Sequence, residues 1–253
     1  MKTTAQPVES VFISGTHAVW EALQGDSTGQ EELLVARQAQ HAKLHQNLEQ
    51  AKKKGIPIRY VSKAALTSLV GHDQHQGLVL RGPAYEYASF DALLAQEKAQ
   101  IEPLLVLDCI QDPQNLGAIL RSACFFGARS VIIPKDRAAP VTSAVIKVAA
   151  GATSHTPVMQ VTNLARSLEQ LKEMGLWIVG LDPQGPQSIY QVDLSVPLGL
   201  VVGNEEKGLR PLTRHNCDAL ANIPRVGLIP SLNAATACAI ALAEMQRQRM
   251  VKI

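Results

Sequence analysis

Four largely apolar runs in the second half of the chain constrain its fold more than any other feature. Each spans five residues, and they lie at 104–108, 130–134, 176–180 and 199–203. A strand buried on both faces has such a continuous apolar pattern, as in a parallel sheet covered by helices. Helical patterns separate or follow these runs, at Leu116–Phe126, Ser143–Ala149, Asn163–Met174, Leu209–Asn216 and Leu232–Arg249. We therefore predict a doubly wound α/β domain, in which ligands bind beyond the carboxyl ends of the strands.

Shorter strand and helix patterns alternate in the first 82 residues. Strands are predicted at Val11–Gly15, Leu33–Ala36, Ile58–Val61 and Gly77–Leu80, and helices at His17–Leu23, His41–Lys54 and Ala64–Val70. This alternation indicates a small α/β domain. The segment Gly82–Tyr85 and the polar stretch after it are typical of a linker. We predict an N-terminal domain at 1–82, a linker at 83–100 and a C-terminal domain at 101–253.

Composition limits the partners and the compartment. The 253 residues are 46% hydrophobic with a net charge of +2, so nucleic-acid binding must come from local patches. The four cysteines are widely spaced and no C-x-x-C pair occurs, which predicts neither a zinc site nor a disulfide framework. The N-terminal residues contain no apolar signal sequence core, and no segment approaches the length of a membrane span. We expect a cytoplasmic protein that binds no metal and no membrane.

Three loops of unusual composition follow predicted strands. In the first, Asn115 stands where a helix would begin and Arg121 follows almost two turns later. An N-cap and a surface arginine are the simpler interpretation; the functional one is an amide for a sugar or base and a guanidinium for a phosphate. The second, Gly203–Leu209, half resembles a P-loop, but Leu209-Arg210 stands where Lys-Ser/Thr is required. No G-x-G-x-x-G fingerprint occurs either, so neither nucleotide motif is present.

The third loop, Ile223–Thr236, contains two prolines and a glycine. It connects a short strand to an Ala-rich helix, which indicates either a shaped pocket or an ordinary connection capped by Ser231. The histidines give no clear indication of a functional site. His41 and His45 lie four apart without the glutamate of a zincin motif, so a solvated helix face is expected. His72 and His75 occupy a polar turn and are expected to be neutral surface residues, with RNA contacts as the alternative.

Together and in this order, the loops resemble the three signature motifs of the SpoU (TrmH-like) RNA ribose 2′-O-methyltransferases of the SPOUT superfamily. The motif residues are Asn115–Arg121, Leu200–Leu209, and Ile223–Pro224 with Ser231–Asn233. The resemblance extends to the family's N-terminal substrate-binding module through Gly15–Val19 and His75–Gly77. It therefore covers nearly the whole chain.

The resemblance implies a C-terminal parallel sheet tied into a deep trefoil knot, S-adenosylmethionine as cofactor, and a homodimer that completes the active site. The cofactor would lie against the backbone around Leu181, Gly203, Ile223 and Leu232. Arg121 and Asn115 would align the ribose hydroxyl, acting from the partner subunit, with support from Glu205, Ser231 and Asn233. Single-stranded or looped RNA is the implied substrate, because a 2′-hydroxyl must be presented with its base splayed out.

Several alternatives stay open at this point. A guanidinium is normally always protonated, so Arg121 either acts as a base or orients the hydroxyl and a phosphate. Relatives often carry Val-Ser-Val after the asparagine, whereas Ala234-Ala235-Thr236 follows Asn233 here, which puts its support in question. The resemblance implies a guanosine of 23S rRNA as target. The alternatives are a tRNA 2′-O-methyltransferase, or a non-catalytic RNA-binding or ribosome-assembly protein that retains the knot.

Overall fold

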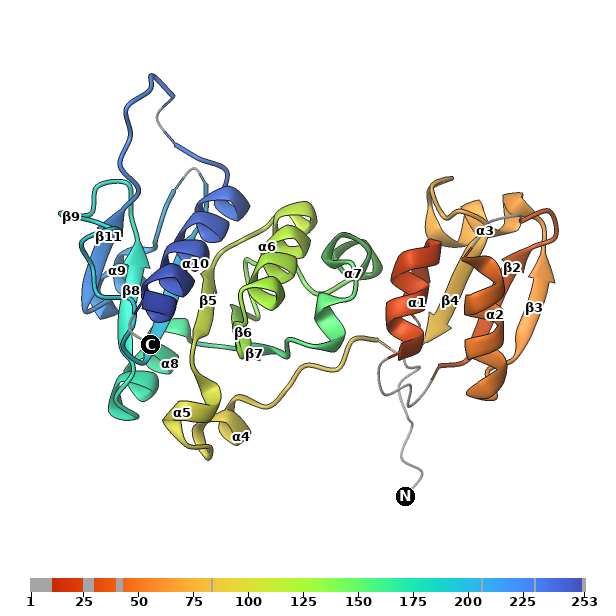
Figure 1. Ribbon diagram of the computed structural model, residues 1–253, viewed down its shortest axis with the longest axis horizontal. Helices are drawn as coiled ribbons and strands as arrows, with labels where there is room; N and C mark the ends of the chain where they lie inside the picture. The colour runs from red at the N-terminus through yellow and green to blue at the C-terminus, as the bar shows by residue number, and fades with distance from the viewer. Residues whose placement is uncertain are drawn as a thin grey trace. The chain divides into compact units, whose positions relative to one another are not determined.

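A computed structural model describes residues 11–24, 30–39, 43–82, 84–205, 207–229 and 231–251. The chain folds into two compact units, one formed by Met1–Glu86 with Val141–Ser154 and the other by Tyr87–Pro140 with His155–Ile253 (Figure 1). The domain limits proposed from the sequence, at 82 and 101, stay predictions.

The first unit is a mixed four-stranded sheet between helices. Its elements are β1 (Val11–Ser14), α1 (Thr16–Gln24), β2 (Glu32–Ala36), α2 (Leu44–Lys53), β3 (Ile58–Val61), α3 (Lys63–Val70), β4 (Leu78–Gly82), α7 (Ser143–Ala149) and η1 (Ala152–Ser154). The strand order is β1-β4-β2-β3, in which only β2 and β3 pair in parallel. Leu33 and Val35 pack with residues of α1 and α2, whereas Leu34 packs with Leu66 of α3 on the other face. This alternation buries both faces of the sheet.

The second unit is a seven-stranded parallel sheet. Its elements are α4 (Phe90–Leu94), α5 (Lys98–Ile101), β5 (Leu104–Asp108), α6 (Pro113–Phe125), β6 (Ser130–Pro134), β7 (Val158–Val161), α8 (Leu164–Glu173), β8 (Trp177–Leu181), β9 (Gln187–Ser188), β10 (Leu198–Gly203), α9 (Pro211–Asn216), β11 (Ala219–Asn222) and α10 (Ala234–Val251). The strand order is β7-β6-β5-β10-β8-β11-β9, and every pair is parallel. The predicted parallel α/β sheet is confirmed.

The apolar runs form the centre of this sheet because both of its faces are covered. Every residue of β5, β6 and β10 is buried. Leu104 and Val106 of β5 pack in one core cluster with Leu168 and Leu171 of α8. Helices α6 and α10 lie side by side and pack on each other (Figure 1). A helix cover of this kind is what continuous apolar strands require.

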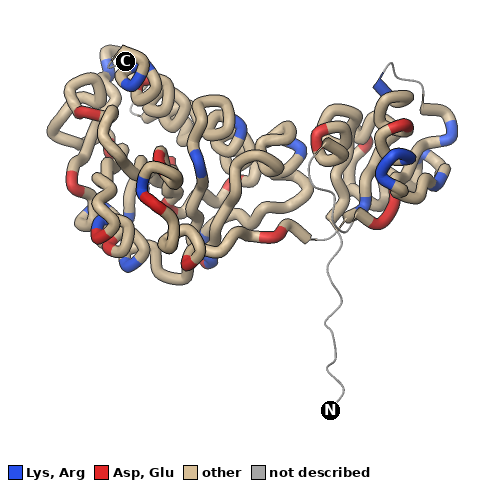
Figure 2. Tube along the Cα trace, turned by 60° about the horizontal axis from the view of Figure 1, so that its bottom comes forward, with Lys and Arg blue, Asp and Glu red and all other residues tan. Residues whose placement is uncertain are grey.

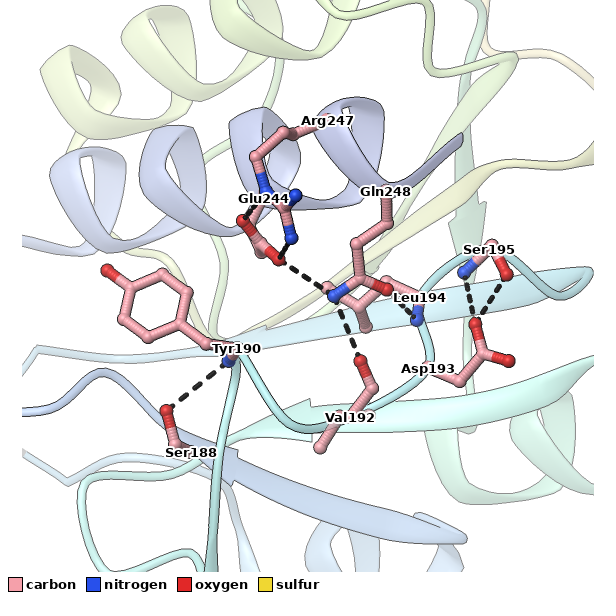
Figure 3. Close-up of polar contacts among 9 residues, drawn as sticks. All are labelled: Ser188, Tyr190, Val192, Asp193, Leu194, Ser195, Glu244, Arg247 and Gln248. Atoms are coloured by element: carbon pink, nitrogen blue, oxygen red, sulfur yellow. Dashed lines mark hydrogen bonds and ion pairs between the residues drawn. The ribbon is translucent and has the colours of Figure 1, made fainter. Parts of the chain in front are cut away.

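Hydrogen bonds join α10 to the segment that precedes β10. The Gln248 side chain accepts a hydrogen bond from Leu194 N at 2.8 Å and donates one to Val192 O at 3.1 Å (Figure 3). The same amide donates to Glu244 at 2.8 Å, so a buried carboxylate holds it in place. Arg249 adds a hydrogen bond of 3.1 Å to Val196 O. The chain between β9 and β10 is thereby held against the end of α10.

Candidate active site

The three motif loops leave one edge of the parallel sheet. Asp108 at the end of β5 pairs with Gly203 at the end of β10, and Leu181 of β8 is in register with Val202 and Ala221. Because all these strands run in the same direction, the loops that follow them start at the same edge. This is where open α/β sheets bind their ligands.

Side chains from all three loops meet there in one hydrogen-bonded network. Asn115 Nδ2 donates to Glu205 Oε1 at 2.5 Å, and Asn233 Nδ2 donates to the same oxygen at 2.7 Å. Asn233 Nδ2 also lies 2.8 Å from Asn115 Oδ1. The backbone N–H of Ala234 adds a third donor to Glu205 Oε1 at 3.2 Å. The carboxylate of Glu205 therefore joins residues that are 90 and 28 positions away.

Both helix caps differ from the simpler interpretations of the sequence. Helix α6 begins two residues before Asn115, and its N-cap is Asp112, which accepts from Gln114 N at 2.9 Å. Interpreting Asn115 as an N-cap is therefore wrong, and its side chain is free to bind Glu205. At α10 the capping side chain is Asn233, which accepts from the N–H groups of the second and third residues after it at 3.0 and 3.2 Å. Ser231 lies outside this cap, so its predicted capping role is also wrong.

A tight turn after β10 places Glu205. Asn204 and Gly208 exchange two backbone hydrogen bonds of 3.1 and 2.9 Å, which closes the turn, and Gly208 adopts a φ of +63°. A Cβ atom on Gly203 would collide with the Gly208 carbonyl and lie 2.7 Å from Leu209 N. Position 203 therefore needs glycine because the chain folds directly back over it.

An ion pair between the buried Asp108 and the partly exposed Arg210 lies at the same edge. Asp108 is fully buried, and its carboxylate accepts from Arg210 N at 2.8 Å and from Arg210 Nε at 2.6 Å. The next residue, Cys109, has a left-handed φ of +61°, and its carbonyl accepts from Asn204 Nδ2 at 3.3 Å. Burial, reinforced by the Asp108 carboxylate, raises the pKa of the Cys109 thiol. The thiol therefore stays protonated near neutral pH and is a poor nucleophile.

Two predicted catalytic residues are not part of the network. Arg121 is exposed on α6, and Ser231 is exposed just before α10. Neither side chain has a hydrogen-bond or ion-pair partner within the described ranges. Arg121 is six residues after Asn115, and this spacing places the two side chains on different sides of the helix. The structure thus brings together Asn115, Glu205 and Asn233 and leaves Arg121 and Ser231 apart.

The four predicted cofactor positions lie along the neighbouring part of the edge. Leu181 ends β8, Gly203 ends β10 and Ile223 follows β11, and these three strands are adjacent. Leu232 lies at the far end of the loop, next to Asn233 of the network. Between them, the loop exposes its large apolar side chains almost completely: Val226, Leu228 and Ile229 are 101%, 100% and 76% exposed. Glu206, within the second motif loop, and Pro230, within the third, lie outside the described residues.

In the first unit, the structure joins the two segments that resemble a substrate-binding module. Gln76 Oε1 accepts from Thr16 N at 2.9 Å and from Thr16 Oγ1 at 2.8 Å. His75 is buried rather than on the surface, which corrects the sequence-based expectation. Its Nδ1 accepts from Gly77 N at 3.0 Å, and its Nε2 lies 3.1 Å from Thr67 Oγ1. Burial and the nearby Lys63 lower the pKa of His75, so the ring is neutral.

His41 and His45 are the two histidines spaced four apart. His45 forms an exposed pair with Glu49 at 3.3 Å, as expected of a solvated helix face, and His41 lies outside the described residues. Among the residues that the structure describes, no three or more His, Cys, Asp or Glu side chains gather as a metal site, and no helix is long and apolar enough to cross a membrane.

Sequence reasoning did not identify the Asp108–Arg210 pair. Asp108 was visible only as the last residue of an apolar strand, and Arg210 only as a departure from the P-loop pattern. A charged residue that ends a fully buried strand was the available signal, because such a charge needs a partner.

Comparisons with known proteins agree with this geometry. Residues 102–243 match the SpoU rRNA Methylase family, and residues 12–88 match the RNA 2′-O ribose methyltransferase substrate binding family. The chain is 41% identical over 240 residues to the putative TrmH family tRNA/rRNA methyltransferase YacO of Bacillus subtilis, covering 94% of this chain and 96% of that protein. It is also 41% identical over 244 residues to the 23S rRNA (guanosine-2′-O-)-methyltransferase RlmB of Xanthomonas axonopodis pv. citri, covering 96% and 98%.

A solved structure shares the fold across both units. The SpoU methyltransferase AviRb of Streptomyces viridochromogenes, determined with AdoMet, superposes with a TM-score of 0.80 at 22% identity, covering 96% of this chain and 91% of that one. The family models together span most of the chain and include all three motif loops. The chain therefore belongs to the SpoU rRNA methylase family.

Proposed function

We propose that this protein transfers the methyl group of S-adenosylmethionine to a ribose 2′-hydroxyl of 23S rRNA, at a guanosine. The observation that carries the proposal is the network of Asn115, Glu205 and Asn233, which gathers one residue from each motif at the ligand-binding edge. The full-length similarity to the RlmB protein supports rRNA as the substrate. The match to a substrate-binding family in the first unit supports an RNA partner.

The residues at the edge fit the cofactor. Bound S-adenosylmethionine supplies a methyl group carried on a positively charged sulfur. Leu181, Gly203, Ile223 and Leu232 would hold it through their main-chain groups, beside the exposed apolar side chains of the loop that follows β11. Burial of such side chains by a ligand is favourable, and their exposure otherwise is unusual.

The chain's own residues then have to align one oxygen and help it to lose a proton. Holding two reacting groups in line lowers the barrier by several kcal/mol, on the order of 7–11 in the best cases. Asn115 and Asn233, fixed by Glu205, orient the hydroxyl in this proposal, with Ser231 next to them. Arg121 grips one of the two phosphates that flank the ribose and orients the hydroxyl rather than acting as a base.

The proposal includes a knot and a homodimer. Two features support a C-terminal knot: the chain continues from β11 into α10, which packs on α6, and Gln248 of α10 binds the segment before β10. On α6, the exposed Arg121 and the 81% exposed Phe125 are one turn apart, which supports a face that a second copy covers. Arg121 would then serve the partner's network. We assign RNA delivery to residues 1–82 and catalysis to residues 101–253, joined by the linker 83–100, in the cytoplasm.

Methyl transfer from radiolabelled S-adenosylmethionine to unmodified 23S rRNA and tRNA tests the proposal. We expect label at a 23S rRNA guanosine, located by mass spectrometry, and a loss of about 10²–10³-fold in turnover for Arg121→Ala without loss of thermal stability. Arg129→Ala, an exposed arginine at the start of β6, is the matched control and should keep full activity. Label in tRNA alone would favour the tRNA alternative. Cofactor binding without transfer to any RNA would favour the non-catalytic alternative.

Mixing two inactive variants tests the shared active site. A heterodimer of Arg121→Ala and Glu205→Gln subunits carries one site with both side chains intact if Arg121 acts across the interface. We expect the mixture to recover activity that neither variant has alone. No recovery, although mixed dimers form, would place Arg121 and Glu205 in the same subunit's site.

A further inference from the structure

A pocket lies beside the network and shares Asn115 and Glu205 with it. Loops that follow β5, β6 and β10 enclose a volume of about 350 Å³, lined by Asn115, Glu205 and three cations, Arg137, Lys207 and Arg210. The loops are joined to one another, because Ala139 N donates to Ile110 O at 2.8 Å. Three loops of the second unit therefore line one pocket.

Arg210 lines this pocket with a guanidinium group that is held at its Nε atom and has both Nη groups available. Its backbone N and its Nε are both bound to the buried Asp108 carboxylate, at 2.8 and 2.6 Å. Its two Nη groups have no hydrogen-bond partner among the described residues, and its side chain is 38% exposed. An arginine held in this way is preorganised for an oxyanion, since less rotamer entropy is lost when the anion binds.

The other charges of the pocket favour an anion as well. Within the described part of the chain, neither Arg137 nor Lys207 has an ion-pair partner. Two carboxylates also line the pocket, and both are hydrogen-bonded to neutral donors: Asp112 caps α6, and Glu205 Oε1 accepts three hydrogen bonds. Acidic and basic residues are otherwise interspersed over both units (Figure 2). The basic side chains Arg137 and Lys207 are thus the charged groups of the lining that have no partner in the described part of the chain.

We propose that this pocket binds one of the two RNA phosphates that flank the methylated ribose, the other being the phosphate assigned to Arg121, and that Asp108 is the positioning residue that holds Arg210 for it. The proposed cofactor positions follow β8, β10 and β11, whereas the pocket follows β5, β6 and β10. The network shares Asn115 and Glu205 with the pocket. A ribose at the network would therefore have one of its phosphates beside the pocket. This inference rests on the proposed function.

The salt dependence of RNA binding tests the phosphate site. We compare the double variant Arg137→Gln/Lys207→Gln with the control Arg129→Gln/Lys98→Gln, which removes the same charge from exposed positions elsewhere in the unit. Binding of a single-stranded rRNA fragment is measured by fluorescence anisotropy from 50 to 300 mM salt. Each phosphate contact contributes a slope of about −0.7 to log K against log salt on single strands. We expect the slope to become shallower by about 0.7 in the pocket variant only.

The kinetic readout separates RNA binding from catalysis. In the pocket variant, KM for RNA should rise about 10-fold, while kcat changes less than threefold and cofactor affinity is unchanged. Equal slopes in pocket variant and control, or no RNA binding by the natural chain, would overturn the phosphate site. RNA binding with the expected slopes but without methyl transfer would overturn the proposed function alone.

Arg210→Lys tests the positioning role without leaving the buried carboxylate unpaired. Lysine keeps the charge beside Asp108, but it lacks the planar guanidinium group that can bind the carboxylate and a phosphate at the same time. We expect KM for RNA to rise while the melting temperature stays within a few degrees of the natural chain. A variant with unchanged KM and unchanged salt slope would show that Arg210 is only a structural partner of Asp108.

Discussion

The negative charge of Glu205 is predicted to stabilise the start of α10 and the whole network. Its Oε1 accepts hydrogen bonds from Asn115 Nδ2, Asn233 Nδ2 and Ala234 N, at 2.5, 2.7 and 3.2 Å. Its Oε2 has no partner among the described residues. Glu205→Gln therefore keeps the shape and the accepting oxygen, and its new amide nitrogen replaces an atom that binds none of the described residues. The substitution removes the charge alone.

The expected cost follows from the three donors. A hydrogen bond to a charged group contributes about 1.5–3 kcal/mol and a neutral one about 1 kcal/mol. The carboxylate also lies at the N-terminus of α10, where a negative charge contributes about 0.3–1 kcal/mol. Because the site is only partly buried, water reduces these differences, and we expect a total loss of about 1–2 kcal/mol. For a chain of this size that corresponds to a melting temperature lower by about 3–6 °C.

Thermal unfolding and amide hydrogen exchange measure this loss. The melting temperature is followed by circular dichroism, and exchange of the Ala234 amide, which donates to Glu205, reports the local effect. Glu169→Gln, an exposed glutamate on α8, is the control and should change the unfolding free energy by less than about 0.5 kcal/mol. The reasoning would be refuted if Glu205→Gln had the same melting temperature as the control and its Ala234 amide exchanged no faster than in the natural chain. The carboxylate would then contribute nothing to stability.

Three further predictions concern single groups. Asn233→Ala removes the N-cap of α10 and should lower the unfolding free energy by about 1 kcal/mol, measured by urea denaturation, whereas Ser231→Ala should not. His75 is held neutral with a lowered pKa, so its contribution is present above pH 6.5 and is lost as the pH falls through the folded-state value. The Gly77 amide donates to His75, so its protection against hydrogen exchange, relative to the intrinsic exchange rate at each pH, should decrease over that range. Burial raises the pKa of Cys238 to about 12 from 9.0, so the unfolded chain loses this proton first as the pH rises. The natural chain should therefore lose stability more steeply than Cys238→Ala between pH 9 and 10.5; equal slopes would contradict the burial of an ionisable thiol.

The sheet of the second unit could be predicted because its central strands are buried on both faces. The run at 104–107 has no polar position to interrupt it, and an apolar run this short between helical patterns is typical of a central parallel strand. The strands at the margins could not be predicted in the same way. Val158–Val161 is short and contains a glutamine, and Ala219–Asn222 offers mostly small side chains. Their pairing depends on neighbouring strands more than on their own pattern.

The site was predicted only as far as its motifs extend. The motif resemblance named the loops, but the contacts between them join residues far apart in the chain, such as Asp108 and Arg210, which are 102 positions apart. Local propensity carries no information on such pairs. The caps show the same limit, since Ser231 and Asn233 are both good capping residues and the choice between them depends on tertiary contacts.

The contacts of Asn233 answer the question that Ala234-Ala235-Thr236 raised. Its Oδ1 is used by two N–H groups of the first turn of α10, and its Nδ2 is used by Asn115 and Glu205. The Thr236 hydroxyl has no partner within the described ranges and so does not replace the serine that the family resemblance implies after Asn233. The support that a neighbouring hydroxyl could provide is supplied here by the carboxylate of Glu205 and the helix backbone. Asn233 is therefore held in a single orientation by charge and capping together, and the loss of the usual neighbour does not by itself argue for an inactive relative.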